Sequence, residues 1–163
     1  MIKKVPSLKK NIAIWFVPRN SSLKPITQNE LKWKKELSNT RSEEFHHSRG
    51  YVRVALSLIF DIPALEIPLF APPSQPPFLP NGMGVVSFSH CIDGLLIGWS
   101  LNNIGVDIER FDRKIDPEKL INNYFSSKER KIFISLEKEK IVPKFLSYWV
   151  RKEAAIKFFR GRI

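Results

Sequence analysis

Residues 84–108 read GVVSFSHCIDGLLIGWSLNNIGVDI. Three apolar runs occupy residues 84–88, 94–101 and 104–108, and short turns with polar residues separate them. Short runs of this kind, bounded by Gly, Asn and Asp, are typical of strands joined by tight turns. The stretch therefore predicts a three-stranded β-meander at the centre of the chain.

The chain before this stretch alternates between strand and helix signals. Residues 11–17 (NIAIWFV) predict a strand, because they are rich in β-branched and aromatic side chains. Thr27 and Glu30 form a capping box that predicts a helix to about Leu37, and residues 48–60 carry apolar side chains at helical spacing. Residues 63–80 contain seven of the twelve prolines, so this segment is expected to be extended.

The chain after the meander is expected to be helical. The sequence Asp116-Pro117-Glu118 is typical of a helix start, and Ser126 with Glu129 forms a second capping box for a helix to about Lys140. Pro143 is expected to open a last helix that runs to about Phe159. Strands followed by helices predict an α+β fold.

Composition limits the class of protein. The chain has 163 residues, 43% of them hydrophobic, and a single cysteine, which excludes a disulfide framework and a cysteine-rich zinc site. The longest apolar run is too short to cross a bilayer, and no signal peptide is recognisable. We therefore expect a cytoplasmic protein without a membrane partner.

The net charge of +11 indicates an anionic partner, such as a nucleic acid, a phosphorylated cofactor or an acidic protein. The basic residues gather in residues 1–50 and 101–163, and the middle of the chain carries little charge. A basic nucleic-acid-binding protein is the main alternative interpretation, although no nucleic-acid-binding module is recognisable.

Two carboxylates end the predicted third strand. Side chains alternate along a strand, so Asp107 and Glu109 are expected to point to one face. Such a pair can bind one Mg²⁺ and leave positions for phosphate oxygens. The alternative is a strand end with solvated acids.

The last predicted helix is apolar on nearly all sides and is therefore expected to be buried on nearly all sides. Glu153 and Lys157 lie one turn apart on it. A buried carboxylate needs a cation, which is either Lys157 or a metal ion. The alternative is an ordinary surface pair of glutamate and lysine.

Ser89 and His90 are expected in the turn after a strand. His90 could donate a hydrogen bond to a phosphate, or it could be an ordinary hairpin residue.

Four segments in this order resemble the Sfp-type 4′-phosphopantetheinyl transferases. They are residues 71–79 (APPSQPPFL), 88–90 (FSH), 104–109 (IGVDIE) and 149–157 (WVRKEAAIK). They are similar to the family's G-K-P-x-L-like segment, its S-H turn, its G-[VI]-D-[IVL]-E strand and its W-x-x-K-E-A-x-x-K helix. The last two motifs at this separation are specific.

The resemblance implies transfer of the phosphopantetheine arm of coenzyme A to a serine of an acyl or peptidyl carrier protein, with Mg²⁺ and without nucleic acid. It also implies two similar α+β lobes, here residues 1–100 and 101–163. The metal ligands would be Asp107, Glu109 and Glu153. Glu153, directly or through a metal-bound water, would take the proton of the carrier serine, and Lys157 would contact the attacked phosphate. The remaining coenzyme A contacts would be Ser89, His90, Arg41 and Arg49.

The chain departs from the family pattern in two places. The family's G-K-P is Ser74-Gln75-Pro76 here, which removes a lysine. The family also continues into further strands after the last helix, whereas this chain stops at Ile163, so the second lobe is expected to be incomplete and to expose apolar side chains. An inactive relative that only binds coenzyme A or the carrier protein is a further alternative.

Overall fold

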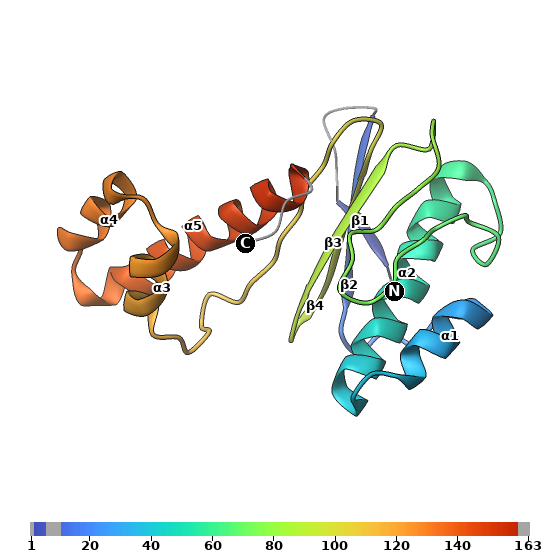
Figure 1. Ribbon diagram of the computed structural model, residues 1–163, viewed down its shortest axis with the longest axis horizontal. Helices are drawn as coiled ribbons and strands as arrows, with labels where there is room; N and C mark the ends of the chain where they lie inside the picture. The colour runs from blue at the N-terminus through green and yellow to red at the C-terminus, as the bar shows by residue number, and fades with distance from the viewer. Residues whose placement is uncertain (1, 6–10, 160–163) are drawn as a thin grey trace.

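A computed structural model describes residues 2–5 and 11–159. Its centre is an antiparallel sheet with the strand order β1-β2-β4-β3 (Figure 1). The strands are β1 (Lys3–Val5), β2 (Ile12–Pro18), β3 (Val85–Cys91) and β4 (Gly94–Ser100). The predictions for β2, β3 and β4 are confirmed within one to three residues, and β1 adds an edge strand.

The helices form two groups on opposite sides of the sheet (Figure 1). α1 (Gln28–Lys35) and α2 (Asn39–Phe60) lie on one side, and Thr27 caps α1 through the predicted capping box. α3 (Pro117–Tyr124), α4 (Ser127–Ile134) and α5 (Lys138–Phe158) form a separate group on the other side. The α+β class is therefore confirmed. Within the described ranges, no helix combines the length and the apolar character that a membrane span requires.

The prediction of a third meander strand at residues 104–108 is wrong. These residues are extended but pair with no strand. The reason is that β4 already pairs with β2 on one edge and with β3 on the other. The segment instead crosses the face of the sheet, where a Cβ added to Gly98 would meet side-chain carbons of Val106 at 2.6 Å and Ile104 at 2.9 Å.

The boundaries of the last two helices also differ from the prediction. α4 ends at Ile134 instead of Lys140, and α5 begins at Lys138 with Pro143 inside it. A proline this close to the start of a 21-residue helix removes a single intrahelical hydrogen bond, which packing can offset.

The two groups of elements have separate hydrophobic cores. The larger core lies between the sheet, α2 and the proline-rich segment, and the smaller lies among α3, α4 and α5. The expectation that α5 is buried on nearly all sides is wrong, because only Phe145 and Leu146 of this helix are buried. Phe158 is 38% exposed and Phe159 is 75% exposed.

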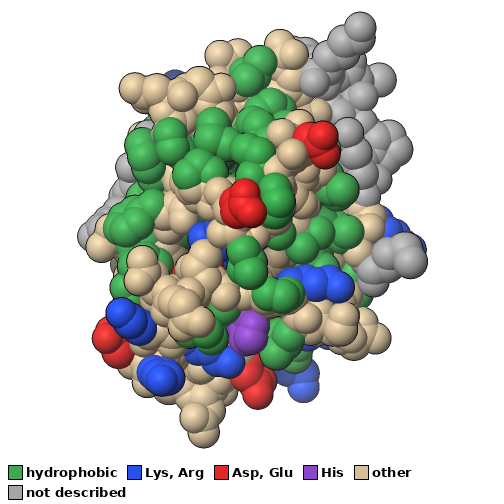
Figure 2. All heavy atoms as spheres, turned by 90° about the vertical axis from the view of Figure 1, so that its right-hand side faces the viewer, with side chains coloured by type: hydrophobic (Ala, Val, Ile, Leu, Met, Phe, Trp, Pro, Cys, Tyr) green, Lys and Arg blue, Asp and Glu red, His purple; other side chains and the backbone are tan. Residues whose placement is uncertain are grey.

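Figure 2 shows the face that carries α1, α2 and the proline-rich segment. Hydrophobic side chains gather over its upper part, and lysine and arginine side chains gather toward its lower part. The second half of α2 and the proline-rich segment contribute several exposed hydrophobic residues, including Leu58, Leu65, Phe70 and Phe78.

Candidate functional site

A cleft of about 470 Å³ opens between the first half of α2, the proline-rich residues 73–77 and strand β3, and it reaches Lys157 on α5. The cleft gathers side chains from four separate parts of the chain. It includes all of the residues expected to contact coenzyme A: Arg41, Arg49, Ser89, His90 and Lys157. The structure thus brings these five residues to one cavity.

A chain of polar contacts joins two residues of the cleft wall, Ser89 and Lys157, through Asp107. The Nζ atom of Lys157 lies 2.7 Å from Oδ1 of Asp107 and 3.3 Å from the carbonyl oxygen of Val106. Ser89 donates its hydroxyl hydrogen to the same Oδ1 at 2.6 Å. These contacts link α5, the extended segment and β3, so that lysine, carboxylate and hydroxyl groups from three elements meet at one point.

Glu109 and Glu153 complete the group of acids. Glu109 forms an i,i+4 ion pair with Arg113. The pKa of Glu153 is raised, first by burial and next by the negative charge of Asp107, with a smaller contribution from Glu109 and an opposing one from Lys157. The three carboxylates therefore lie close enough to influence one another.

The described residues contain no three His, Cys, Asp or Glu side chains gathered closely enough to hold a metal ion as they stand. Instead, Lys157 forms an ion pair with Asp107, and Arg113 forms one with Glu109. The donors nevertheless fit Mg²⁺ in their chemistry, because all three offer the carboxylate oxygens that this ion prefers. Binding would require Arg113 to release Glu109.

Arg49 is part of the cleft wall. It is 6% exposed, and its Nε atom donates to the carbonyl of Ala71 at 2.7 Å. Its Nη1 and Nη2 atoms donate to Ser48 Oγ at 3.2 Å and to the Pro72 carbonyl at 3.4 Å. The rings of Phe45 and Phe88 lie 4.4 and 4.8 Å from the guanidinium carbon. Burial lowers the pKa of Arg49 to about 10, with Glu30 opposing this effect.

Arg41 contrasts with Arg49, although both line the cleft. Its side chain is exposed, and no hydrogen bond or ion pair joins it to another described residue. Arg41 is thus free to meet an anion, whereas Arg49 is committed to the backbone of the proline-rich segment.

The position of Ser89 and His90 differs from the prediction. Both lie within β3 and not in the turn, because β3 continues to Cys91 and the turn is formed by Ile92 and Asp93. The Nε2 atom of His90 lies 3.1 Å from Oε2 of Glu44, another residue of the cleft. Glu44 is a cleft residue that the sequence did not predict, because nothing in the pattern of α2 marks it.

A second pair was also missed. Arg53 and Glu30 form a buried ion pair, with Nε of Arg53 2.9 Å from Oε2 of Glu30. A signal was present in the sequence: Arg49 and Arg53 lie four residues apart among the apolar positions of a predicted amphipathic helix. Arginine on an apolar helix face needs a buried partner.

Residues 103–163 match the family model of the 4′-phosphopantetheinyl transferase superfamily. The match contains Asp107, Glu109, Glu153 and Lys157, and the other walls of the cleft come from residues before it. A search of curated proteins found no match to this chain.

Proposed function

We propose that the chain is an Sfp-type 4′-phosphopantetheinyl transferase, which moves the phosphopantetheine arm of coenzyme A to a serine of a carrier protein with Mg²⁺. One observation carries this proposal: the cleft that gathers Arg41, Ser89 and His90 reaches Lys157, which pairs with Asp107 inside the segment matched by the family model. The two hydrophobic cores support an assignment of residues 1–100 and 101–163 to two lobes.

The cleft suits a nucleotide cofactor. Its volume lies in the range of small-molecule sites, and its walls combine prolines and phenylalanines with a few polar groups. Arg41 supplies a free positive charge for a phosphate. His90 would turn a ring N–H group from Glu44 to the cofactor, and Ser89, whose hydroxyl donates to Asp107, would accept or exchange a hydrogen bond beside Lys157.

The three acids beside Lys157 would bind the metal ion and not the nucleotide. Asp107, Glu109 and Glu153 would hold Mg²⁺, which supplies neutralisation of the diphosphate and of the leaving group when bound. Until then, Lys157 pairs with Asp107 and Arg113 pairs with Glu109.

The transfer needs one bond to form and one to break. The carrier serine oxygen bonds to the phosphorus next to the pantetheine arm, and the bond from that phosphorus to the oxygen of adenosine 3′,5′-bisphosphate breaks. Glu153 accepts the proton of the serine hydroxyl. Lys157 stabilises the negative charge that develops on the attacked phosphate, as a fixed ammonium group can in a partly buried site.

The proposal is tested by incubating the protein with an apo carrier protein, coenzyme A and Mg²⁺ and measuring the mass of the carrier. We expect the carrier to gain one phosphopantetheine group. A carrier with its acceptor serine replaced by alanine is the matched control and should gain nothing. A protein that binds coenzyme A but never modifies any carrier would be the inactive relative, and the proposed transfer would be wrong.

A further inference from the structure

The proline-rich segment forms one wall of the cleft but has little backbone structure of its own. In the part of the chain that the structure describes, residues 61–80 contain one isolated bridge, between Phe70 and Phe78, and no regular helix or strand. Prolines lack an N–H group, and buried carbonyl groups must find donors elsewhere. A few local backbone hydrogen bonds, such as those between Phe70 and Phe78, form within the segment, and donors from other elements add to them in setting the shape of this wall.

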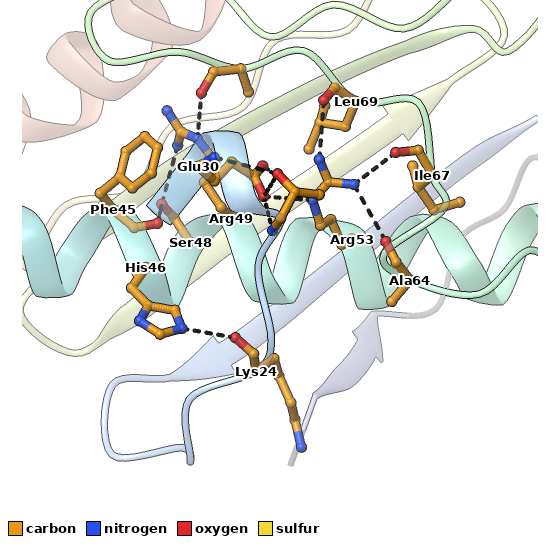
Figure 3. Close-up of polar contacts among 12 residues, drawn as sticks. Lys24, Glu30, Phe45, His46, Ser48, Arg49, Arg53, Ala64, Ile67 and Leu69 are labelled. Carbon is orange, nitrogen blue, oxygen red and sulfur yellow. Dashed lines mark hydrogen bonds and ion pairs between the residues drawn. The ribbon is translucent and has the colours of Figure 1, made fainter. Parts of the chain in front are cut away.

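Two arginines on consecutive turns of α2 supply those donors (Figure 3). Arg53 donates from Nη1 to the carbonyls of Ile67 at 2.7 Å and Ala64 at 3.4 Å, and from Nη2 to the carbonyl of Leu69 at 3.2 Å. Arg49 continues the series at residues 71 and 72. The two side chains thus hold the segment along residues 64–72, directly before the part that lines the cleft.

Glu30 makes this arrangement possible. It is 1% exposed, and Nε of Arg53 donates to its two oxygens at 3.1 and 2.9 Å. Its Oε2 atom also accepts from the backbone N–H of Thr27 at 2.8 Å and from the Thr27 hydroxyl at 2.9 Å. A buried charge pair is tolerated when its hydrogen-bonding groups are satisfied. Glu30 therefore balances the charge of Arg53 and fixes it to the start of α1.

We propose that Arg53 and Glu30 are positioning residues for coenzyme A: neither lines the cleft, and together they hold the proline-rich wall at its distance from β3. The identity of the ligand rests on the proposed function. Loosening this wall should weaken coenzyme A binding and leave the reacting groups at Asp107 and Lys157 in place.

The test uses Arg53→Lys in the full chain. Lysine keeps the positive charge beside Glu30 but lacks the planar fork that reaches several carbonyls at once. We expect hydrogen-exchange protection of the Phe70 and Phe78 amides to fall about tenfold or more, and protection in the β2–β4 ladder to change less than about twofold. In the transfer assay, the KM for coenzyme A should rise about tenfold and kcat should stay within about twofold.

Val17→Ala is the matched control, because Val17 is fully buried in the same core but belongs to β2, where it pairs with Leu95 of β4. It should lower stability and protection throughout the first core without a selective change at Phe70 and Phe78, and it should leave the KM for coenzyme A unchanged.

Wild-type protection at Phe70 and Phe78 in a folded Arg53→Lys protein would overturn the proposal, as would lost protection with an unchanged KM. If wild-type protein transfers nothing, the proposed function fails. The positioning role is then decided by the exchange data and by the Kd for coenzyme A, which should rise in Arg53→Lys. If Arg53→Lys does not fold, Glu30→Gln takes its place, since glutamine still supports a capping box; the same two outcomes then decide.

Discussion

The two halves of the molecule bury their side chains in different ways. In the first half, the sheet and α2 enclose large side chains completely, such as Trp15 and Tyr51 at 2% exposure. In the second half, aromatic rings hold the helices together and several stay partly exposed: Trp149, itself half-buried, stacks on the fully buried Phe145 and contacts the exposed Tyr124. We infer that the first half, which is the sheet with α1, α2 and the proline-rich segment, forms most of the cleft wall. The second half, which is α3, α4 and α5, places Lys157 at the cleft.

The extended segment, which packs on the sheet through Ile104 and Val106, meets α5 at a glycine. A Cβ atom at Gly105 would lie 1.9 Å from the carbonyl oxygen of Ala154 and 2.5 Å from the backbone nitrogen of Phe158. The backbone of the extended segment therefore rests directly on α5, two residues before Asp107. This contact sets the position of Lys157 against Asp107, so the proposed chemistry depends on the junction of the two halves.

The largest effect is expected when the acid at the junction is removed. Asp107→Ala should lower the transfer rate by about 10²–10³ or more, the range seen when one electrostatic group of a reacting site is lost. The circular dichroism spectrum should stay native, because the first core does not contain this residue. Asp112→Ala is the control, since Asp112 is an exposed acid that pairs with Arg110 away from the cleft. A normal rate for Asp107→Ala would remove Asp107 from the reaction.

Separating the halves should have the next largest effect. Gly105→Ala forces α5 away from the extended segment, and overpacking of this kind costs about 1–3 kcal/mol. We expect transfer to fall about tenfold or more, as the contact between Asp107 and Lys157 lengthens. Thermal melting and the transfer assay measure the two effects. Asn103→Ala, at an exposed position of the same segment, should change neither. Unaltered activity in Gly105→Ala would mean that the junction does not set the site.

A change in the first half alone should affect binding more than chemistry. His90→Ala removes a donor from the cleft, and a hydrogen bond to a charged group contributes about 1.5–3 kcal/mol. The KM for coenzyme A should therefore rise about tenfold or more, with a smaller change in kcat. Ile92→Ala, in the exposed turn nearby, is the control. A lower melting temperature with unchanged kinetics would identify His90 as an ordinary hairpin residue.

The smallest effect is expected inside the second half. Lys152 pairs with Glu129 at 2.9 Å, and both side chains are more than a quarter exposed. Lys152→Met should lower stability by about 0.5 kcal/mol, as is usual for such pairs, and leave transfer unchanged. The pair of Lys140 with Glu137 is far more exposed, so Lys140→Met should have no measurable effect.

The contribution of the Lys152–Glu129 pair to stability should depend on pH. The hydrogen bond from Lys152 lowers the pKa of Glu129, so its stabilising contribution is complete above the ordinary glutamate pKa and is lost as the pH falls through the lowered value. Acid melting curves should show a smaller loss in Lys152→Met than in the wild type. Identical acid profiles would show that the pair contributes nothing.

Features of the fold that depend on neighbours in sequence were predictable. The capping boxes at Thr27 and Ser126 and the strands at β2 and β4 follow from local patterns and are confirmed. The path of residues 104–108 was not predictable in this way. An apolar run does not reveal that both edges of β4 are already paired, nor that the segment crosses the face of the sheet.

The residues of the site also fall into two groups, those marked by local sequence and those whose role depends on distant parts of the chain. Four of its side chains lie in short motifs, and the resemblance they carry indicated Ser89, His90, Asp107 and Lys157, which the structure brings together. The roles of Arg49 and Arg53 depend on carbonyl groups up to 23 residues away in a segment without periodicity. Only the folded chain brings those carbonyls to α2.

Titration calorimetry with coenzyme A, in the presence and absence of Mg²⁺, tests the central claim most directly. If the cleft of the first half and the acids at the junction form one site, wild-type protein should bind coenzyme A more tightly with Mg²⁺. Asp107→Ala should then bind it with an affinity that Mg²⁺ no longer changes. A wild-type protein that does not bind coenzyme A, or whose affinity is the same with and without Mg²⁺, would contradict the account.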